Sequence, residues 1–218
     1  MNNEKSIYVW DISVRIFHWA LVISFVIAYL TAEEKNIWHI YSGYTVLGLI
    51  TFRVLWGIIG TRYARFSDFI YSPRTVFNYI NELINKSPKR YIGHNPAGGW
   101  MIIAMLACLF VVVISGLEVY AIEEGRGPLA EETKIDSKII RTAQADRDEV
   151  NDHEEGKRYG RNKGEGNKQN EEFWEEIHEV TTNIMLLLIF LHITGVVLSS
   201  RLHRENLVKA MITGKKNI

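Results

Sequence analysis

The chain has 218 residues, and its 25 basic and 25 acidic side chains cancel to a formal net charge of zero. This balance removes any general electrostatic argument for nucleic-acid binding, so no nucleic-acid partner is expected. The mean hydropathy of −0.03 resembles that of a water-soluble protein, but it averages long apolar runs with one strongly charged stretch. The single cysteine, Cys108, excludes an internal disulfide and the C-x-x-C-H attachment site of c-type haem.

Four apolar runs predict four membrane-spanning helices, each close to the roughly 20 residues that a helix needs to cross hydrocarbon. They cover about residues 14–32, 39–60, 100–122 and 178–200. Four buried helices of a soluble bundle are the alternative, and the length of the runs argues against it. The sequence therefore predicts an all-α fold, an integral membrane four-helix bundle built as a single domain over residues 1–218.

The loops predict the orientation of this bundle in the membrane. Basic side chains outnumber acidic ones in the connection 61–99 and in the tail after Ser200. By the positive-inside rule, both segments face the cytoplasm. Because the chain crosses four times, both termini are expected on the cytoplasmic side.

A short helix is predicted within the connection 61–99. Ser72 followed by Pro73 is typical of a helix start, with serine as the N-cap and proline in the first helical position. Phe77, Ile80 and Ile84 then fall on one face of the helix. This pattern indicates an amphipathic helix that lies on the membrane surface.

The segment 123–173 is a charged insertion, predicted as a long periplasmic loop between the third and fourth spans. It holds fourteen acidic and ten basic residues, which gives a net charge of −4. It has few apolar side chains with which to form a core. We therefore expect residues 156–170 to be disordered unless a partner orders them.

Two histidines of the fourth span carry the functional prediction. His178 and His192 are fourteen residues apart, which on an α-helix is a rise of about 21 Å and about 40° short of four full turns. Both imidazoles therefore leave one face at two depths. Because ionisable side chains are costly inside a bilayer, they are expected to have functional partners on neighbouring helices.

Depth along the spans selects the partners. His39 opens the second span at the outer surface, as His178 opens the fourth, whereas His18 and His192 both lie toward the cytoplasmic side. The predicted pairs are an outer one, His39 with His178, and an inner one, His18 with His192. This arrangement suits two non-covalent b-type haems, each with its iron held between two imidazoles. A zinc site would need its ligands around one point, which the 21 Å separation forbids.

Four further residues are expected to line the haems. Arg53 lies fourteen residues after His39, hence on the same helix face, and it could bind a haem propionate or extend to the membrane interface. Arg15, one turn before His18, is a second candidate for a propionate. Gly43 and Gly195 could leave room for a flat macrocycle or simply let helices pack. The remaining histidines, His94, His153 and His203, are interpreted as surface residues.

The sequence resembles the bacterial di-haem cytochrome b family that includes cytochrome b-561 and the b-type subunits of nickel-iron hydrogenases. The matching stretches are RIFHWALVISF, WHIYSGYTVLGLITFRVLWGIIG, GHNPAGGWMIIAMLACLFVVVISGL and WEEIHEVTTNIMLLLIFLHITGVVLSSRLHRENLVKAMITGKK. The resemblance implies the same four histidines as haem ligands. It also implies a bacterial inner-membrane protein that passes electrons between the quinone pool and a periplasmic partner. That partner would be a cytochrome c, a dehydrogenase or a hydrogenase subunit.

Two other functions stay open at the level of sequence. Small members of the family resemble superoxide:quinone oxidoreductases, but such an enzyme needs a basic funnel for its anionic substrate, and the outward insertion is acidic. A haem-bearing membrane anchor is the non-redox alternative. We favour an electron-transfer subunit that is not an enzyme on its own, with quinone expected near the inner haem.

Overall fold

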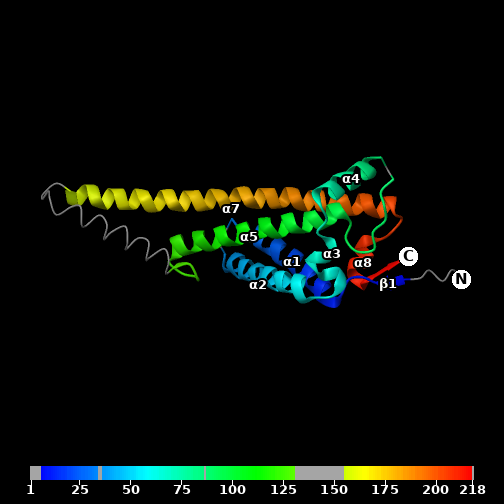
Figure 1. Ribbon diagram of the computed structural model, residues 1–218. Helices are drawn as coiled ribbons and strands as arrows, with labels where there is room; N and C mark the ends of the chain where they lie inside the picture. The colour runs from blue at the N-terminus through cyan, green and yellow to red at the C-terminus, as the bar shows by residue number, and fades with distance from the viewer. Residues whose placement is uncertain (1–5, 34–35, 86, 131–154, 218) are drawn as a thin grey trace. The chain divides into compact units, whose positions relative to one another are not determined.

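The computed structural model describes residues 6–33, 36–85, 87–130 and 155–217 (Figure 1). The chain divides into two compact units, one made of residues 1–110 and 184–218 and the other of residues 111–183. The elements are, in chain order, β1 (Ser6–Tyr8), α1 (Ile12–Leu30), α2 (Ile37–Ile59), η1 (Arg62–Ala64), α3 (Phe66–Phe69), α4 (Pro73–Ile84), α5 (Pro96–Glu124), α7 (Glu155–Leu202), α8 (Leu207–Thr213) and β2 (Lys215–Asn217).

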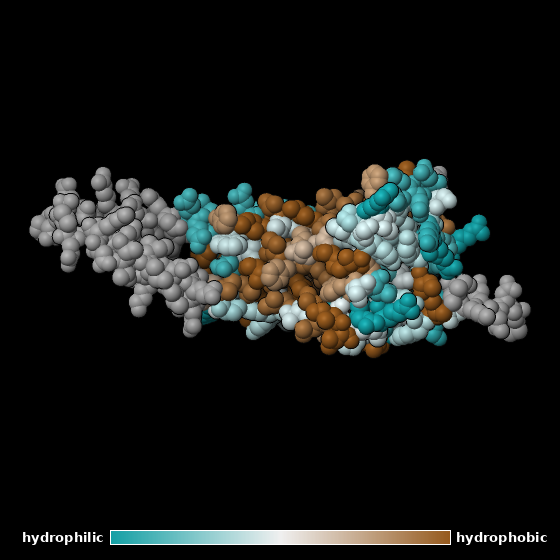
Figure 2. Space-filling model, in the orientation of Figure 1, coloured by the Kyte–Doolittle hydropathy of each residue, from teal (hydrophilic) through white to brown (hydrophobic). Residues whose placement is uncertain are grey.

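Four helices of the described residues are long and apolar enough to cross a membrane: α1, α2, α5 and residues 168–202 of α7. The predicted all-α fold with four apolar helices is confirmed. Only 11% of the apolar window of α1 and 6% of that of α7 are buried, and Figure 2 shows hydrophobic atoms on the outer surface of the helices. Exposed apolar surface of this extent is unfavourable in water and suits contact with lipid.

In the first unit, helices α1 and α2 pack against each other. The helix α1 begins where the carboxylate of Asp11 accepts a hydrogen bond from the amide of Val14 at 2.9 Å. The residues of α2 that are buried recur every three or four positions and so form a single face. They are Ser42, Val46, Ile50, Arg53 and Gly57.

The two ends of the chain pair in the same unit, which the sequence did not predict. Strands β1 and β2 are antiparallel, with Tyr8 opposite Lys215. Gly214 adopts a left-handed conformation with φ of 81°, and its carbonyl accepts hydrogen bonds from the amides of Val9 and Trp10 at 2.8 and 3.1 Å. Val9 and Trp10 then form a small core with Ala210 of α8.

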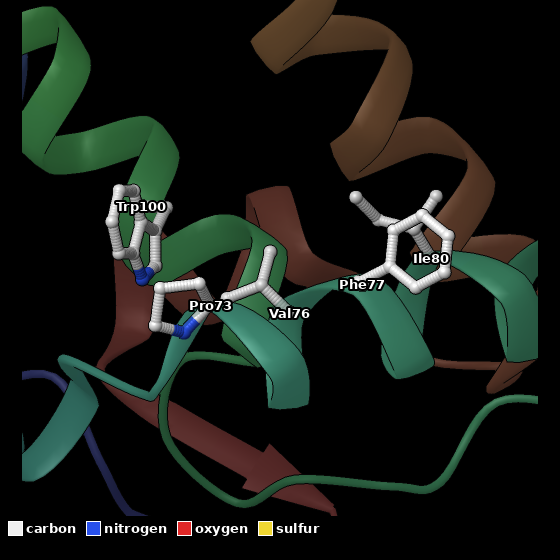
Figure 3. Close-up of a pocket in the computed structure, with 5 residues that line it drawn as sticks. All are labelled: Pro73, Val76, Phe77, Ile80 and Trp100. Atoms are coloured by element: carbon white, nitrogen blue, oxygen red, sulfur yellow. The ribbon is translucent and has the colours of Figure 1, made fainter.

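The predicted amphipathic helix is confirmed as α4, and the hydroxyl of Ser72 caps it by accepting a hydrogen bond from the amide of Thr75. Its apolar face is exposed at Phe77 and Ile84. An open pocket of about 220 Å³ lies between this face and the start of α5. Figure 3 shows the side chains that line it, which are Pro73, Val76, Phe77, Ile80 and Trp100.

The second unit contains the end of α5 and the beginning of α7. Helix α7 begins at Glu155, so the backbone of residues 156–170 is helical where we expected disorder. The apolar span that follows gives a physical reason for this helix. Once a helix has formed, each residue added to its end gains one backbone hydrogen bond, so extension costs less than nucleation. Residues 131–154 of the predicted insertion lie outside the described part of the chain.

Candidate functional site

The four histidines singled out by sequence all lie on the long apolar helices, and each is partly buried. His18 is on α1, His39 on α2, and His178 and His192 are on α7. His18, His39 and His192 belong to the first unit, and His178 belongs to the second. The environment of each ring decides what its two nitrogens can do.

The ring of His39 is oriented by helix α1. Its Nδ1 atom lies 2.8 Å from the carbonyl oxygen of Ala28. A carbonyl oxygen can only accept, so Nδ1 carries the proton and the neutral ring has its lone pair on Nε2. This is the form in which imidazole ligates a metal, with its second nitrogen held by a backbone carbonyl.

His178 has the same arrangement in the second unit. Its Nδ1 lies 2.9 Å from the carbonyl oxygen of Val112 and 3.1 Å from the hydroxyl of Ser115, both on α5. A Cβ atom at Gly116 would lie 3.0 Å from Cε1 of His178. The glycine therefore permits this close approach of α5 to the imidazole.

Sequence reasoning missed the residues of α5 that position His178. Ser115 is fully buried, and its hydroxyl donates to the carbonyl of Val111 at 2.8 Å. The signal in the sequence is a polar residue and a glycine, adjacent, in the middle of an apolar run. Such a pair is common where helices pack, so by itself it does not indicate a functional site.

His18 and His192 are close enough in the first unit for their imidazoles to interact electrostatically. The edge of the His18 ring meets Trp19, with 5.1 Å between ring centroids. Its Nδ1 is buried and has no hydrogen-bond partner within the described part of the chain. A buried polar nitrogen of this kind is costly unless a ligand or water satisfies it.

The two glycines expected beside the haems lie in open space. A Cβ atom built on Gly43 or Gly195 would meet no heavy atom within 4 Å in the described structure. The same is true of Gly48, also on α2. Nothing in the packing of the described residues therefore requires a glycine at these positions.

Arg53 is the most deeply buried charge of the candidate site, with only 3% of its surface exposed. Its guanidinium lies over the ring of Phe66, 4.9 Å from the centroid, and 5.8 Å from that of Phe69. These contacts are favourable for a cation. The Nη1 atom, however, is buried without a hydrogen-bond partner among the described residues, so the site lacks an acceptor.

Arg15 is attached to the ends of the chain. Its guanidinium donates to the carbonyl of Ile212 and to the hydroxyl of Tyr8 at 3.1 Å. Only its Nε atom is buried without a partner in the described residues. Arg53 therefore offers more to an anion than Arg15 does.

Of the remaining histidines, His94 is partly buried, and its ring lies against Trp10 and Phe69 at centroid distances of 4.5 and 4.6 Å. Ring stacking in a loop depends on the tertiary fold and has no periodic signal in the sequence. His203 is partly exposed, and His153 lies outside the described residues.

Comparison with known proteins identifies the family. The model of the prokaryotic cytochrome b561 family matches residues 9–214. A protein of Rhodobacter capsulatus named "Probable Ni/Fe-hydrogenase B-type cytochrome subunit" is 23% identical, over 99% of this chain and 83% of its own length. A protein of Azotobacter vinelandii with the same name is 26% identical, over 60% of this chain and 66% of its own length. No solved structure matches the chain.

The family match covers nearly the whole chain, including all four histidines and Arg53. It agrees with the four long apolar helices, and b-type cytochromes carry haem that is not covalently attached. The chain belongs to the prokaryotic cytochrome b561 family and is an integral membrane b-type cytochrome of electron transport.

Proposed function

We propose that the chain is the di-haem electron-transfer subunit of a quinone-linked complex, and that it exchanges electrons with a periplasmic redox partner. The observation that supports this most directly is the orientation of His39 and His178. In both, a backbone carbonyl accepts a hydrogen bond from Nδ1–H. The lone pair is then on Nε2, on the side of the ring away from that carbonyl. Two imidazoles fixed in this way on apolar helices suit the axial ligation of haem iron.

The proposed ligand pairs are His39 with His178 and His18 with His192. The outer pair is inferred from the depth of the residues along their spans. The inner pair has further support from the electrostatic interaction between the two rings. A haem with two imidazole ligands supplies reversible one-electron chemistry.

The residues of the chain hold, orient and shield the haems in this proposal. The carbonyls of Ala28 and Val112 fix the ring planes of the outer ligands and raise their basicity. Arg53 supplies a buried positive charge for a propionate, and Arg15 is the weaker second candidate. The open space at Gly43 and Gly195 accommodates the macrocycles. The apolar helices exclude water, which limits reorganisation during electron transfer.

The partners follow from chemistry and from the relatives. Those relatives are named as cytochrome subunits of Ni/Fe hydrogenases, so a hydrogenase is the first candidate on the periplasmic side. Another dehydrogenase or a cytochrome c would use the same haem chemistry. We place the quinone near the inner haem and the protein in the bacterial inner membrane, with both termini in the cytoplasm as the positive-inside rule requires.

The experiment is a reduced-minus-oxidised difference spectrum of the purified protein, recorded with added quinol and with dithionite. We expect two low-spin b-type haems per chain, both reducible by quinol. Replacing His39 or His178 by alanine should remove one spectral component, and replacing His18 or His192 the other. His203→Ala is the matched control and should retain both haems.

Two results would contradict the proposal. Loss of the same component in His18→Ala and His39→Ala would show that the pairing is wrong. Haems that bind fully but do not respond to quinol would support a membrane anchor instead of an electron-transfer subunit.

A further inference from the structure

The loop that precedes α5 carries a histidine whose ring packs against two aromatic side chains. The ring of His94 is tilted by 52° to that of Trp10 and by 54° to that of Phe69. Its Nδ1 atom is buried and makes no hydrogen bond to another described residue. A buried imidazole nitrogen without a partner indicates an absent ligand or water.

The local sequence fixes the position of this ring. Asn95 caps α5 by accepting a hydrogen bond from the amide of Gly98 at 2.7 Å, and Pro96 occupies the first turn. Gly99 lies so close to the backbone of Phe69 that a side chain at this position would collide with it. The carbonyl of His94 itself accepts a hydrogen bond from Tyr71.

The C-terminal strand holds the same loop from its other side. The ammonium of Lys216 donates to the carbonyls of Tyr91 and Ile92 at 3.2 and 3.1 Å. It also forms an ion pair with Glu205 at 3.2 Å. Glu205 also pairs with Arg90, so this network of side chains keeps the loop in place.

Arg53 lies next to His94. Both contact the ring of Phe69, Arg53 through its guanidinium and His94 through its imidazole. Burial lowers the pKa of His94 to about 3, and the positive charge of Arg53 is the next cause. His94 is therefore neutral at physiological pH and can donate one hydrogen bond from Nδ1 without adding a second positive charge.

No ion pair among the described residues joins Arg53 to an acidic side chain. Asp11 is the carboxylate that acts on Arg53 electrostatically, without a direct contact. The oxygens of Asp11 instead accept hydrogen bonds from the amide of Val14, the indole of Trp56 and the hydroxyl of Thr61. A buried arginine is costly without an anion, so this charge calls for a ligand.

We propose that Arg53 and His94 together form a carboxylate-binding site, and that its ligand is a propionate of the inner haem. The charge of Arg53 and the Nδ1–H of His94 supply two donors for one carboxylate, a charge-assisted arrangement. The choice of ligand rests on the proposed function, because His94 is electrostatically close to His192, a proposed inner ligand. A quinone carbonyl or a lipid phosphate could accept the same hydrogen bonds, and the test below distinguishes them.

The test uses the intact protein, with its haem carboxylates labelled by growth on 1-13C-5-aminolevulinate. In infrared difference spectra between the oxidised and reduced protein, the bands that shift with the label then belong to the propionates. In His94→Phe, which keeps the aromatic stack, and in Arg53→Gln, the labelled carboxylate bands should shift relative to wild type. His203→Phe, a histidine outside the site, should leave them unchanged.

Redox titration supplies a second readout that a merely structural role would not change. Loss of a donor leaves more negative charge near the iron and favours the ferric state. We expect the equilibrium constant for reduction of the inner haem to fall about tenfold in Arg53→Gln, which is about 59 mV for a one-electron couple. Arg53→Lys retains the charge, so the potential of its inner haem should lie close to that of wild type. This variant can be measured even if Arg53→Gln binds haem poorly.

Labelled bands that stay as in wild type in His94→Phe, or an inner-haem potential that stays as in wild type in Arg53→Gln, would overturn the inference. A change in quinone-analogue binding or in bound phospholipid, without a change in the labelled bands, would also overturn it. Either result leaves the proposed function intact if both haems are present. A wild-type protein without two haems would instead contradict the proposed function itself.

Discussion

The Nδ1 atom of His178 lies 2.9 Å from the carbonyl oxygen of Val112, one helical turn before Gly116 on α5. The glycine lets the imidazole come this close, because a Cβ atom at Gly116 would lie 3.0 Å from Cε1 and 3.2 Å from Nδ1 of the same ring. Since Nδ1 binds the carbonyl, the direction of Nε2 depends on this contact. Gly116 was not among the predicted site residues, yet it permits the contact that orients His178, which was.

The first prediction concerns Gly116. In Gly116→Val the branched side chain would displace the His178 ring from the carbonyl of Val112. We expect loss of one haem component in the difference spectrum, with a smaller effect in Gly116→Ala. Ala104→Val, at an exposed position of the same helix, is the matched control and should retain both haems. Full haem content in Gly116→Val would show that the contact is not needed for ligation.

The second prediction compares two glycines of α2, Gly43, which is half-buried, and Gly48, which is exposed. A Cβ atom at Gly43 or at Gly48 would meet nothing within 4 Å, so packing of the described residues alone predicts that both tolerate leucine. If a haem fills the space next to Gly43, only Gly43→Leu should lower haem content and thermal stability. Equal haem content in the two variants would mean that the space at Gly43 holds something other than a haem.

The burial of Arg53 on one face of α2 could be predicted from helical arithmetic. A fourteen-residue step predicts that Arg53 lies on the same face of α2 as His39, and the structure buries Arg53 on the face that also contains Ser42 and Val46. The period of the buried positions and the apolar runs carry this information locally. Local patterns of this kind suffice for helices that cross a membrane.

The remaining features depend on contacts between distant segments. The ring of His94 is held by Trp10, 84 residues earlier in the chain, and its loop is held by Lys216 near the C-terminus. The three-residue strands that pair Tyr8 with Lys215 have no alternating pattern that would predict them. A loop histidine and two short termini acquire their structure only when the whole unit has folded.

The third prediction concerns pH. Burial raises the pKa of Asp11, but hydrogen bonds from Thr61, Val14 and Trp56 outweigh it, so the pKa lies below the usual 3.8. The ionised carboxylate therefore stabilises the fold above about pH 4, and this contribution is lost as the pH falls through the lowered pKa. Asp11→Ala also removes the N-cap of α1, so we expect a loss of about 1 kcal/mol at pH 7.

Thermal unfolding in detergent at pH 7 and at pH 3 measures this effect. The difference between wild type and Asp11→Ala should be largest at pH 7 and should shrink in acid. Ser13→Ala, two residues away, should not show this dependence. A difference that is independent of pH would assign the effect to the loss of packing and not to the carboxylate.

The last prediction concerns the acidic end of the second unit. Carboxylate oxygens of Glu123, Glu171 and Glu175 lie within 4.8 Å of one another, and Glu172 and Glu176 are exposed on the same stretch of α7. This stretch immediately precedes His178, a proposed ligand of the outer haem. An acidic surface next to a haem should attract a basic redox protein and speed its encounter.

We expect the double variant Glu172→Lys, Glu176→Lys to slow oxidation of the reduced haems by a basic c-type cytochrome about tenfold at low ionic strength. The difference should largely disappear at 1 M salt, where the screening length falls to about 3 Å. Asn78→Lys, an exposed position on α4, adds positive charge at the proposed cytoplasmic side and should leave the rate unchanged. Stopped-flow absorbance at the haem bands measures all three rates. If the double variant and Asn78→Lys slow the reaction equally, net charge governs the encounter, and the acidic stretch before His178 is not the docking surface.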